Sequence, residues 1–95
     1  MKKYIYGLID SRSGNFGDVC ILDRDEEFRN GCVSLLMNPD IPDYVVQDLE
    51  GVRYGCIIYD SDMSYPKFDI ETTPALIVAG RDLVPLRKQK FADGN

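Results

Sequence analysis

Apolar residues occupy both faces of the first predicted strand. Residues 3–9 (Lys-Tyr-Ile-Tyr-Gly-Leu-Ile) are mostly β-branched or aromatic, which favours an extended conformation. Because side chains alternate along a strand, Tyr4, Tyr6 and Leu8 share one face, and positions 5, 7 and 9 share the other. A strand with two mostly apolar faces is typical of the centre of a sheet.

A turn and a second strand follow directly. Residues 10–15 (Asp-Ser-Arg-Ser-Gly-Asn) combine the residue types that favour turns, and Gly14 and Asn15 tolerate positive φ angles. Residues 17–22 are predicted to form a short strand. The first two strands are therefore expected to form a hairpin.

The hydrophobic period then changes to that of a helix. Phe28, Cys32 and Leu35 recur at helical spacing, which predicts a helix over residues 24–37 with one buried stripe. We expect Asp23 to cap its first turn, with Glu26 reaching back to the backbone, and Asn38-Pro39 to end it.

The second half of the chain predicts one more helix and three strands. Pro42 and Gly51 bracket a predicted helix of two turns. Strands are predicted over residues 52–60, over 67–71 as a short edge strand, and from Pro74 to Ala79.

With the short edge strand 67–71 left out of the count, the order ββα(α)ββ predicts an α+β fold, a small antiparallel sheet with helices packed on one face. Residues 1–84 are predicted to form a single domain. Residues 85–95 contain few apolar side chains and are expected to be a flexible basic tail.

Composition narrows the class of protein without giving an activity. The 95 residues carry a net charge of −5, which argues against a simple polyanion-binding protein. Five basic and fourteen acidic side chains lie within residues 10–78, whereas the two ends are weakly basic. No apolar run is long enough for a membrane helix and no signal peptide is apparent, so we expect a cytoplasmic protein that does not contact a membrane.

Residues that carry chemistry are scarce. The chain contains no histidine, and Cys20, Cys32 and Cys56 lie in apolar stretches where a small buried hydrophobe is the expected role. The acidic residues at 23–27 and 60–62 fit a helix start and a turn better than a metal site. Phosphate-binding loops and nucleophile-elbow motifs are missing. We therefore expect no catalytic residue, metal or cofactor.

Tyrosines and a few basic residues leave nucleic-acid binding open. Single-stranded DNA proteins combine aromatic platforms with a basic groove. If DNA is contacted, the candidates are Lys2, Lys3, Arg12 and Arg53 for phosphates, with Tyr4, Tyr6 and Tyr54 for base stacking. The alternative is that these rings pack in the core or in a dimer contact.

Two helices can cover only one face of the predicted sheet. The other apolar face or an edge strand is therefore expected to bind a second copy of the chain or a partner protein. This pattern predicts a binding module, with a homodimer as the expected assembly.

The order of motifs over residues 3–84 resembles the small nonstructural protein of gokushoviruses, single-stranded DNA phages of the microvirus group. The resemblance is carried by residues 4–6 followed by Asp10-Ser11-Arg12-Ser13-Gly14-Asn15-Phe16, the helix ending at Asn38-Pro39-Asp40, the tyrosine strand from Tyr54 to Asp60, and Ala79-Gly80-Arg81-Asp82-Leu83.

The resemblance implies a role in phage DNA replication in the host cytoplasm, similar to that of protein C of phiX-type microviruses, which helps to switch replication toward single-stranded genomes for packaging. Such a protein would bind single-stranded DNA or the replication complex. An acidic protein-binding module that engages a host factor, even as a DNA mimic, is the alternative prediction, and a minor structural component of the virion is a third.

Overall fold

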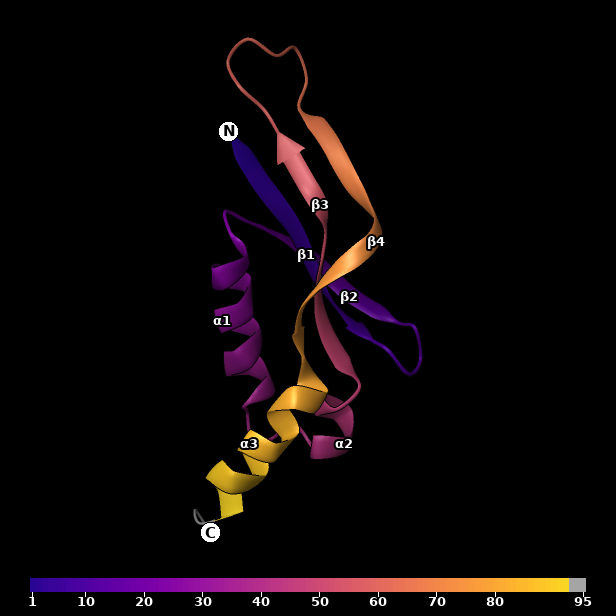
Figure 1. Cartoon of the computed structure of the whole chain (residues 1–95), viewed down its shortest axis with the longest axis vertical. Helices are drawn as coiled ribbons and strands as arrows, with labels where there is room; N and C mark the ends of the chain where they lie inside the picture. Colours follow the sequence, from indigo (N-terminus) through magenta and orange to yellow (C-terminus); the bar gives the residue numbers. More distant parts are fainter. Residues whose placement is uncertain (93–95) are drawn as a thin grey trace.

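Two β-hairpins with helices between them build the molecule, and a third helix ends it. The computed structural model describes residues 1–92. Its elements are β1 (Lys2–Asp10), β2 (Phe16–Leu22), α1 (Asp25–Leu36), α2 (Asp43–Val46), β3 (Leu49–Ile58), β4 (Lys67–Ala79) and α3 (Gly80–Ala92). Figure 1 shows α1, α2 and α3 gathered beside the lower half of the sheet, while the β3–β4 hairpin extends beyond them.

The four strands form one antiparallel sheet in the order β2-β1-β3-β4. The central strand β1 pairs with both β2 and β3, so Tyr4 lies opposite Leu22 on one side and Cys56 on the other. The predicted α+β class, with helices placed between two pairs of strands, is confirmed. β1 is a central strand, as its two apolar faces predict.

The start of α1 differs from the expected capping box. The N-cap residue is Arg24, and no side chain caps the first turn. Asp23 instead forms an ion pair with Lys3, at 3.3 Å between Oδ1 and Nζ. The carboxylate of Asp25 points to the sheet. Contacts with the sheet therefore outweigh the local capping preference at this helix start.

Two predicted elements have different lengths in the structure. The helix after Pro42 is a single turn, α2, because β3 already begins at Leu49. The predicted short strand and last strand are one strand, β4, which runs through Pro74. β4 lies at the edge of the sheet, where a proline need not donate a hydrogen bond to a neighbour. β4 has more residues than its neighbour β3. The pairing register of the two strands shifts on either side of Arg53, and these shifts accommodate the additional residues of β4.

The expected tail from residue 85 is wrong for residues 85–92, which belong to α3. Leu83 packs against Leu36 and Val46, and the side chain of Arg87 is 2% exposed. The largely polar helix α3 is therefore held against α1 and α2 by one buried arginine and one leucine. Residues 93–95 of the predicted tail lie outside the described residues.

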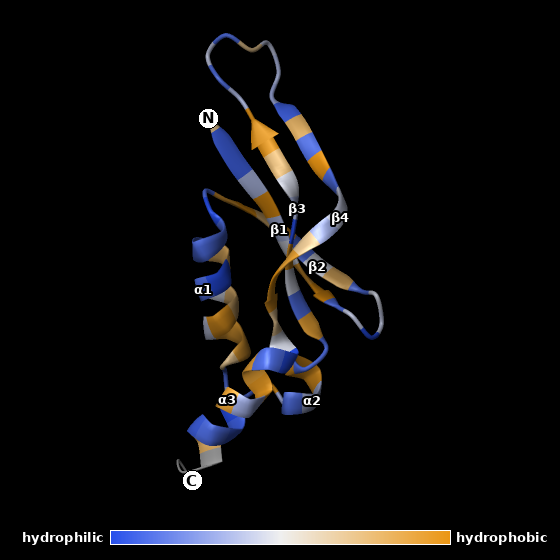
Figure 2. Ribbon diagram, viewed as in Figure 1, coloured by the Kyte–Doolittle hydropathy of each residue, from blue (hydrophilic) through white to orange (hydrophobic). Residues whose placement is uncertain are grey.

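The core consists of two clusters on the helix side of the sheet. Under α1, Tyr6, Phe28 and Cys32 are buried together. Between the end of α1, α2 and α3, a second cluster contains Leu36, Val46 and Leu83. The hydropathy colouring in Figure 2 shows hydrophobic residues on the side of α1 that faces the sheet, but also along strands that no helix covers.

The molecule is elongated, with extents of 57 × 25 × 17 Å. No helix within residues 1–92 is both long and apolar enough to cross a lipid bilayer.

Candidate functional site

The expected DNA-stacking residue Tyr6 is a core residue. Its side chain is fully buried, and its ring stacks on Phe28 of α1 at 4.5 Å between centroids. Its hydroxyl donates to Asp25 Oδ1 at 2.7 Å. Because α1 covers this half of the sheet, the Tyr6 ring cannot stack on a base, and that assignment is corrected.

Arg53 is held in an ion-pair cluster beside Tyr6. Its guanidinium donates to Asp25 Oδ2 at 2.6 Å and to Glu71 Oε2 at 2.9 Å, and it lies 5.6 Å from the centroid of the Tyr4 ring. Burial on its own would raise the pKa of the Asp25 carboxyl, but the hydrogen bonds from Tyr6 and Arg53 outweigh burial and lower it. Arg53 therefore ties α1 to β3 and β4, and both of its acidic partners compete with any phosphate.

This cluster predicts a specific loss of stability in acid. Since the pKa of Asp25 is lower in the folded chain, its contribution is present above the unfolded pKa of about 3.9 and is lost as the pH falls further. We expect Asp25→Asn to lower the free energy of unfolding by about 1–2 kcal/mol at pH 7, because charged hydrogen bonds are lost. Urea denaturation at pH 7 and at pH 3 should show the difference between variant and parent shrinking in acid. An equal difference at both pH values would contradict this role.

The remaining candidate DNA residues are spread over the molecule. Tyr54 lies on the face opposite Tyr6, where its ring covers Gly7 so closely that a Cβ on Gly7 would lie 2.8 Å from it. Lys2 and Arg12 are both exposed, but Lys2 is the first residue of the nine-residue strand β1 and Arg12 follows its other end. Lys3 is paired with Asp23. Tyr4 contacts both Tyr6 and Arg53. Tyr6 is buried under α1 and Tyr54 lies on the other face, so the structure does not bring the set into one groove.

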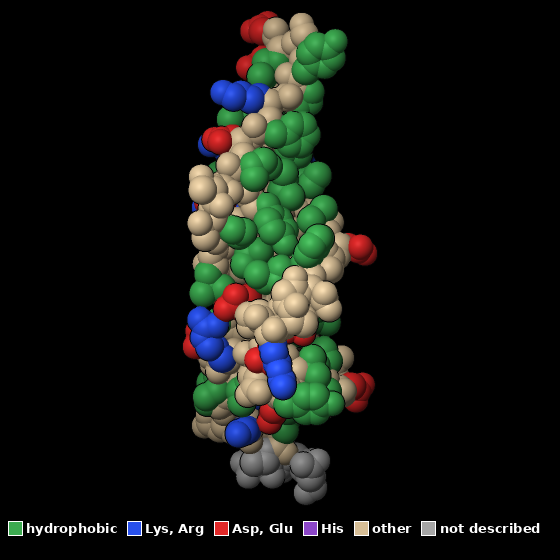
Figure 3. All heavy atoms as spheres, turned by 90° about the vertical axis from the view of Figure 1, so that its right-hand side faces the viewer, with side chains coloured by type: hydrophobic (Ala, Val, Ile, Leu, Met, Phe, Trp, Pro, Cys, Tyr) green, Lys and Arg blue, Asp and Glu red, His purple; other side chains and the backbone are tan. Residues whose placement is uncertain are grey.

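The sheet face that points away from α1 carries apolar side chains on all four strands. Paired residues point to the same side, so Ile5 shares this face with Ile21 of β2 and, through Gly55, with Ile70 of β4. We call this surface the open sheet face and define it by Ile5, Phe16, Val19, Ile21, Tyr54, Phe68, Ile70 and Leu76. Figure 3, viewed from the side away from α1, shows hydrophobic side chains gathered over the middle of the molecule.

Large side chains on this face are strongly exposed. Phe16 is 72% exposed, Phe68 61% and Val19 57%. Ile5, Phe16, Val19 and Tyr54 line a shallow hollow of about 300 Å³ near the β2 edge. Contiguous apolar surface of this kind marks interaction sites in soluble proteins.

Charges at both ends of the open sheet face are paired within the chain. Lys3 and Asp23 face each other at one end. Glu50, opposite Ile9 in register, accepts a hydrogen bond from Arg81 at 2.7 Å at the other end. The apolar middle of the face is therefore bordered by charges that already have partners.

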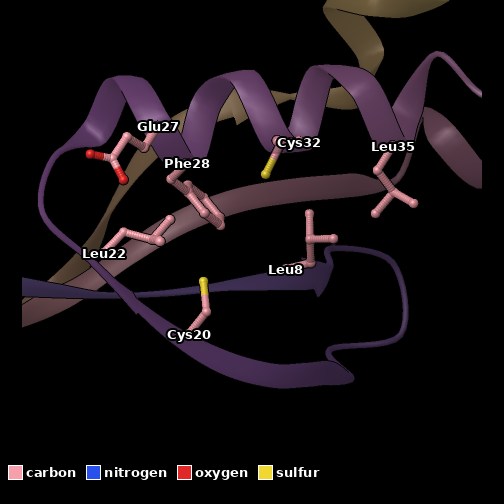
Figure 4. A pocket seen from close by; sticks show the side chains of 8 residues that line it. Leu8, Cys20, Leu22, Glu27, Phe28, Cys32 and Leu35 are labelled. Atoms are coloured by element: carbon pink, nitrogen blue, oxygen red, sulfur yellow. The ribbon is translucent and has the colours of Figure 1, made fainter.

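A second groove runs between α1 and β2. Figure 4 shows the thiols of Cys20 and Cys32 pointing into it from opposite walls, with Leu8, Leu22 and Phe28 around them; its volume is about 240 Å³. Cys20 is exposed because it lies on the edge strand β2, beside the open groove, so its expected burial is wrong. Cys32 and Cys56 are buried as predicted.

Both thiols in this groove are poor nucleophiles. Burial raises the pKa of Cys32 to about 11 and also raises that of Cys20, so both are protonated at neutral pH. Within residues 1–92, no three His, Cys, Asp or Glu side chains are grouped so that they could hold a metal ion. The open sheet face is therefore the strongest candidate for function.

The sequence predicts an uncovered sheet face but does not indicate most of the residues that form it. Phe16 and Val19 share it only because the β1–β2 register shifts between Gly7 and Ile9. Phe68, Ile70 and Leu76 all have even numbers within residues 67–79, and this alternation was the available signal.

Comparison of the chain with family models, curated proteins and solved structures found no match in any of the three.

Proposed function

We propose that this chain is a non-catalytic binding module that contacts protein through the open sheet face. The observation that carries the proposal is the exposure of Phe16, Val19 and Phe68 on one continuous sheet surface. A soluble protein rarely leaves such a patch bare unless a partner covers it.

The resemblance to the small nonstructural protein of gokushoviruses gives this module a role. In that role it acts in the host cytoplasm during phage DNA replication, and it promotes the switch toward single-stranded genomes by binding the replication complex. A homodimer is part of the proposal. The geometry supports a protein contact because the surface is apolar and its bordering charges are paired.

Direct binding of single-stranded DNA has weaker support. A DNA groove needs unpaired basic groups beside accessible aromatic rings. Here Tyr6 is buried, Arg53 is bound to two carboxylates, and Tyr54 lies on the other side of the sheet. Lys2, Arg12 and the partly exposed Tyr4 remain, and they do not form one platform.

Two measurements on the same proteins test the proposal. We expect the immobilised chain to retain a replication protein from nuclease-treated phage-infected cells, and Val19→Lys to abolish this retention. Leu35→Lys places the same charge at an exposed leucine of α1, on the opposite side, and should retain the protein. Fluorescence anisotropy should show no binding of a single-stranded oligonucleotide at low salt. Salt-sensitive oligonucleotide binding, with protein retention unaffected by Val19→Lys, would instead support the DNA alternative.

A further inference from the structure

The described chain exposes more surface than a compact protein of its mass. Its accessible area is 6507 Å², whereas a folded monomer of 10.8 kDa has about 5,500 Å². The radius of gyration is 15.7 Å, against about 12.4 Å for a compact domain of this length. The excess of roughly 1,000 Å² belongs to the whole elongated chain, and it leaves room for the ~800 Å² that each partner contributes to a standard interface.

The charge distribution permits two copies to meet at this surface. A chain with net charge −5 repels a copy of itself unless the contact surface is neutral. The apolar middle of the open sheet face meets this condition, since Lys3–Asp23 and Glu50–Arg81 are closed pairs at its ends. Contact between two such faces buries no unpaired charge from these four residues.

The shape of the face is also self-complementary. The hollow lined by Ile5, Phe16, Val19 and Tyr54 lies near the β2 edge. Ile70 and Leu76, which are 60% and 50% exposed, stand on β4 at the opposite edge. In the sheet register Ile70 is level with Ile5, and Leu76 is level with Gly7 and Val19. A two-fold axis that runs parallel to the strands, between two stacked sheets, places β2 of one copy opposite β4 of the other. Each hollow then receives the exposed side chains of the partner's edge strand.

We infer that a second copy of this chain covers the open sheet face, in a two-fold face-to-face dimer that seats Ile70 and Leu76 of each copy over the partner's hollow. The inference rests on the proposed function, since it makes a second copy of the chain the protein that contacts this surface. The replication complex then binds the dimer, which Val19→Lys disrupts. The helices remain on the two outer sides of the dimer, and four layers result: helix, sheet, sheet and helix.

Light scattering during size exclusion tests the dimer. At about 100 μM, a concentration well above the Kd of a typical interface of this size, the chain should elute at twice its 10.8 kDa mass. Val19→Lys should weaken the dimer by at least about 100-fold, because the ammonium would be buried without a partner. Leu35→Lys should remain a dimer. Circular dichroism should show that both variants are folded, since both positions are exposed.

Mixing two variants tests the arrangement. Val19→Lys and Leu76→Glu should each be monomeric alone but dimerise when mixed, since one contact then joins a lysine to a glutamate and the other is unaltered. The matched control mixes Val19→Lys with Val19→Glu and should stay monomeric. If only the control mixture of Val19→Lys and Val19→Glu formed a dimer, the proposed arrangement would be wrong, because β2 would then lie opposite β2.

The remaining outcomes separate this inference from the proposed function. A monomer at every concentration, or a dimer that Val19→Lys does not weaken, would overturn the inference. If a monomeric chain still retains a replication protein in a Val19-dependent manner, only the dimer is wrong. If it retains none, both proposals fail.

Discussion

Replacing Arg87 by Met should lower the free energy of unfolding by about 3–5 kcal/mol. The guanidinium is almost completely buried and donates to Asp43 Oδ1 at 2.8 Å and to the carbonyl oxygen of Asn38 at 2.9 Å. It also donates to the carbonyls of Leu36 and Ile41. Met fills much of the same volume but leaves these acceptors without a donor in a poorly solvated region.

Urea denaturation of three variants measures this effect. Arg87→Lys keeps the charge but has no planar group of five donors, so it should be less stable than the parent chain and more stable than Arg87→Met. Lys88→Ala, at an exposed position in the same helix, is the control and should differ little from the parent. Equal stability of Arg87→Met and the parent would show that α3 does not depend on this residue.

The role of Arg87 illustrates what the sequence does not reveal. Its partners are more than forty residues away along the chain, and no local pattern distinguishes it from the neighbouring Lys88 and Lys90. Pro85 and the polar composition argue locally against a helix from residue 85. Long-range packing of Leu83 and Arg87 supplies the stabilisation that local propensity lacks.

The strands were predictable because alternation and β-branched residues are local signals. The predicted strand over residues 3–9 corresponds to β1, and the helix over residues 24–37 corresponds to α1 to within a residue at each end. The errors in β4 arose at Pro74, where a strand passes through a proline because it lies at an edge. Whether a strand lies at an edge depends on the whole sheet.

The candidate site was predicted only at the level of a surface. Counting helices against sheet faces correctly predicted an uncovered apolar face. Tyr6 and Tyr54 lie on opposite faces of the sheet, and the face that α1 covers determines which of them is accessible. The alternation of residues along a strand separates the two faces but does not indicate which one the helix covers. The β-bulge beside Gly7 adds Phe16 to the open sheet face, and a bulge has no clear signal in a single sequence.

A methyl group at Gly80, where β4 passes into α3, should be the other strongly destabilising change. A Cβ built there would lie 1.8 Å from the carbonyl oxygen of Val46 and 2.9 Å from that of Leu49. Both atoms belong to the backbone, at the end of α2 and the start of β3, so no side-chain rotation can relieve the overlap. The close approach of α3 to α2 therefore depends on the absence of a side chain at this position.

We expect Gly80→Ala to lower the free energy of unfolding by about 3 kcal/mol, near the upper end of overpacking effects, because backbone segments must separate. Gly31→Ala is the matched control: a Cβ at Gly31, in the middle of α1, has no atom within 4 Å beyond its chain neighbours and the backbone of its own helix. Alanine there should stabilise the chain by roughly 0.5–1 kcal/mol, since it favours the helix. Thermal and urea unfolding of both variants should thus shift in opposite directions. A shift of Gly80→Ala to higher stability would mean that α3 does not pack against the Val46 carbonyl in solution.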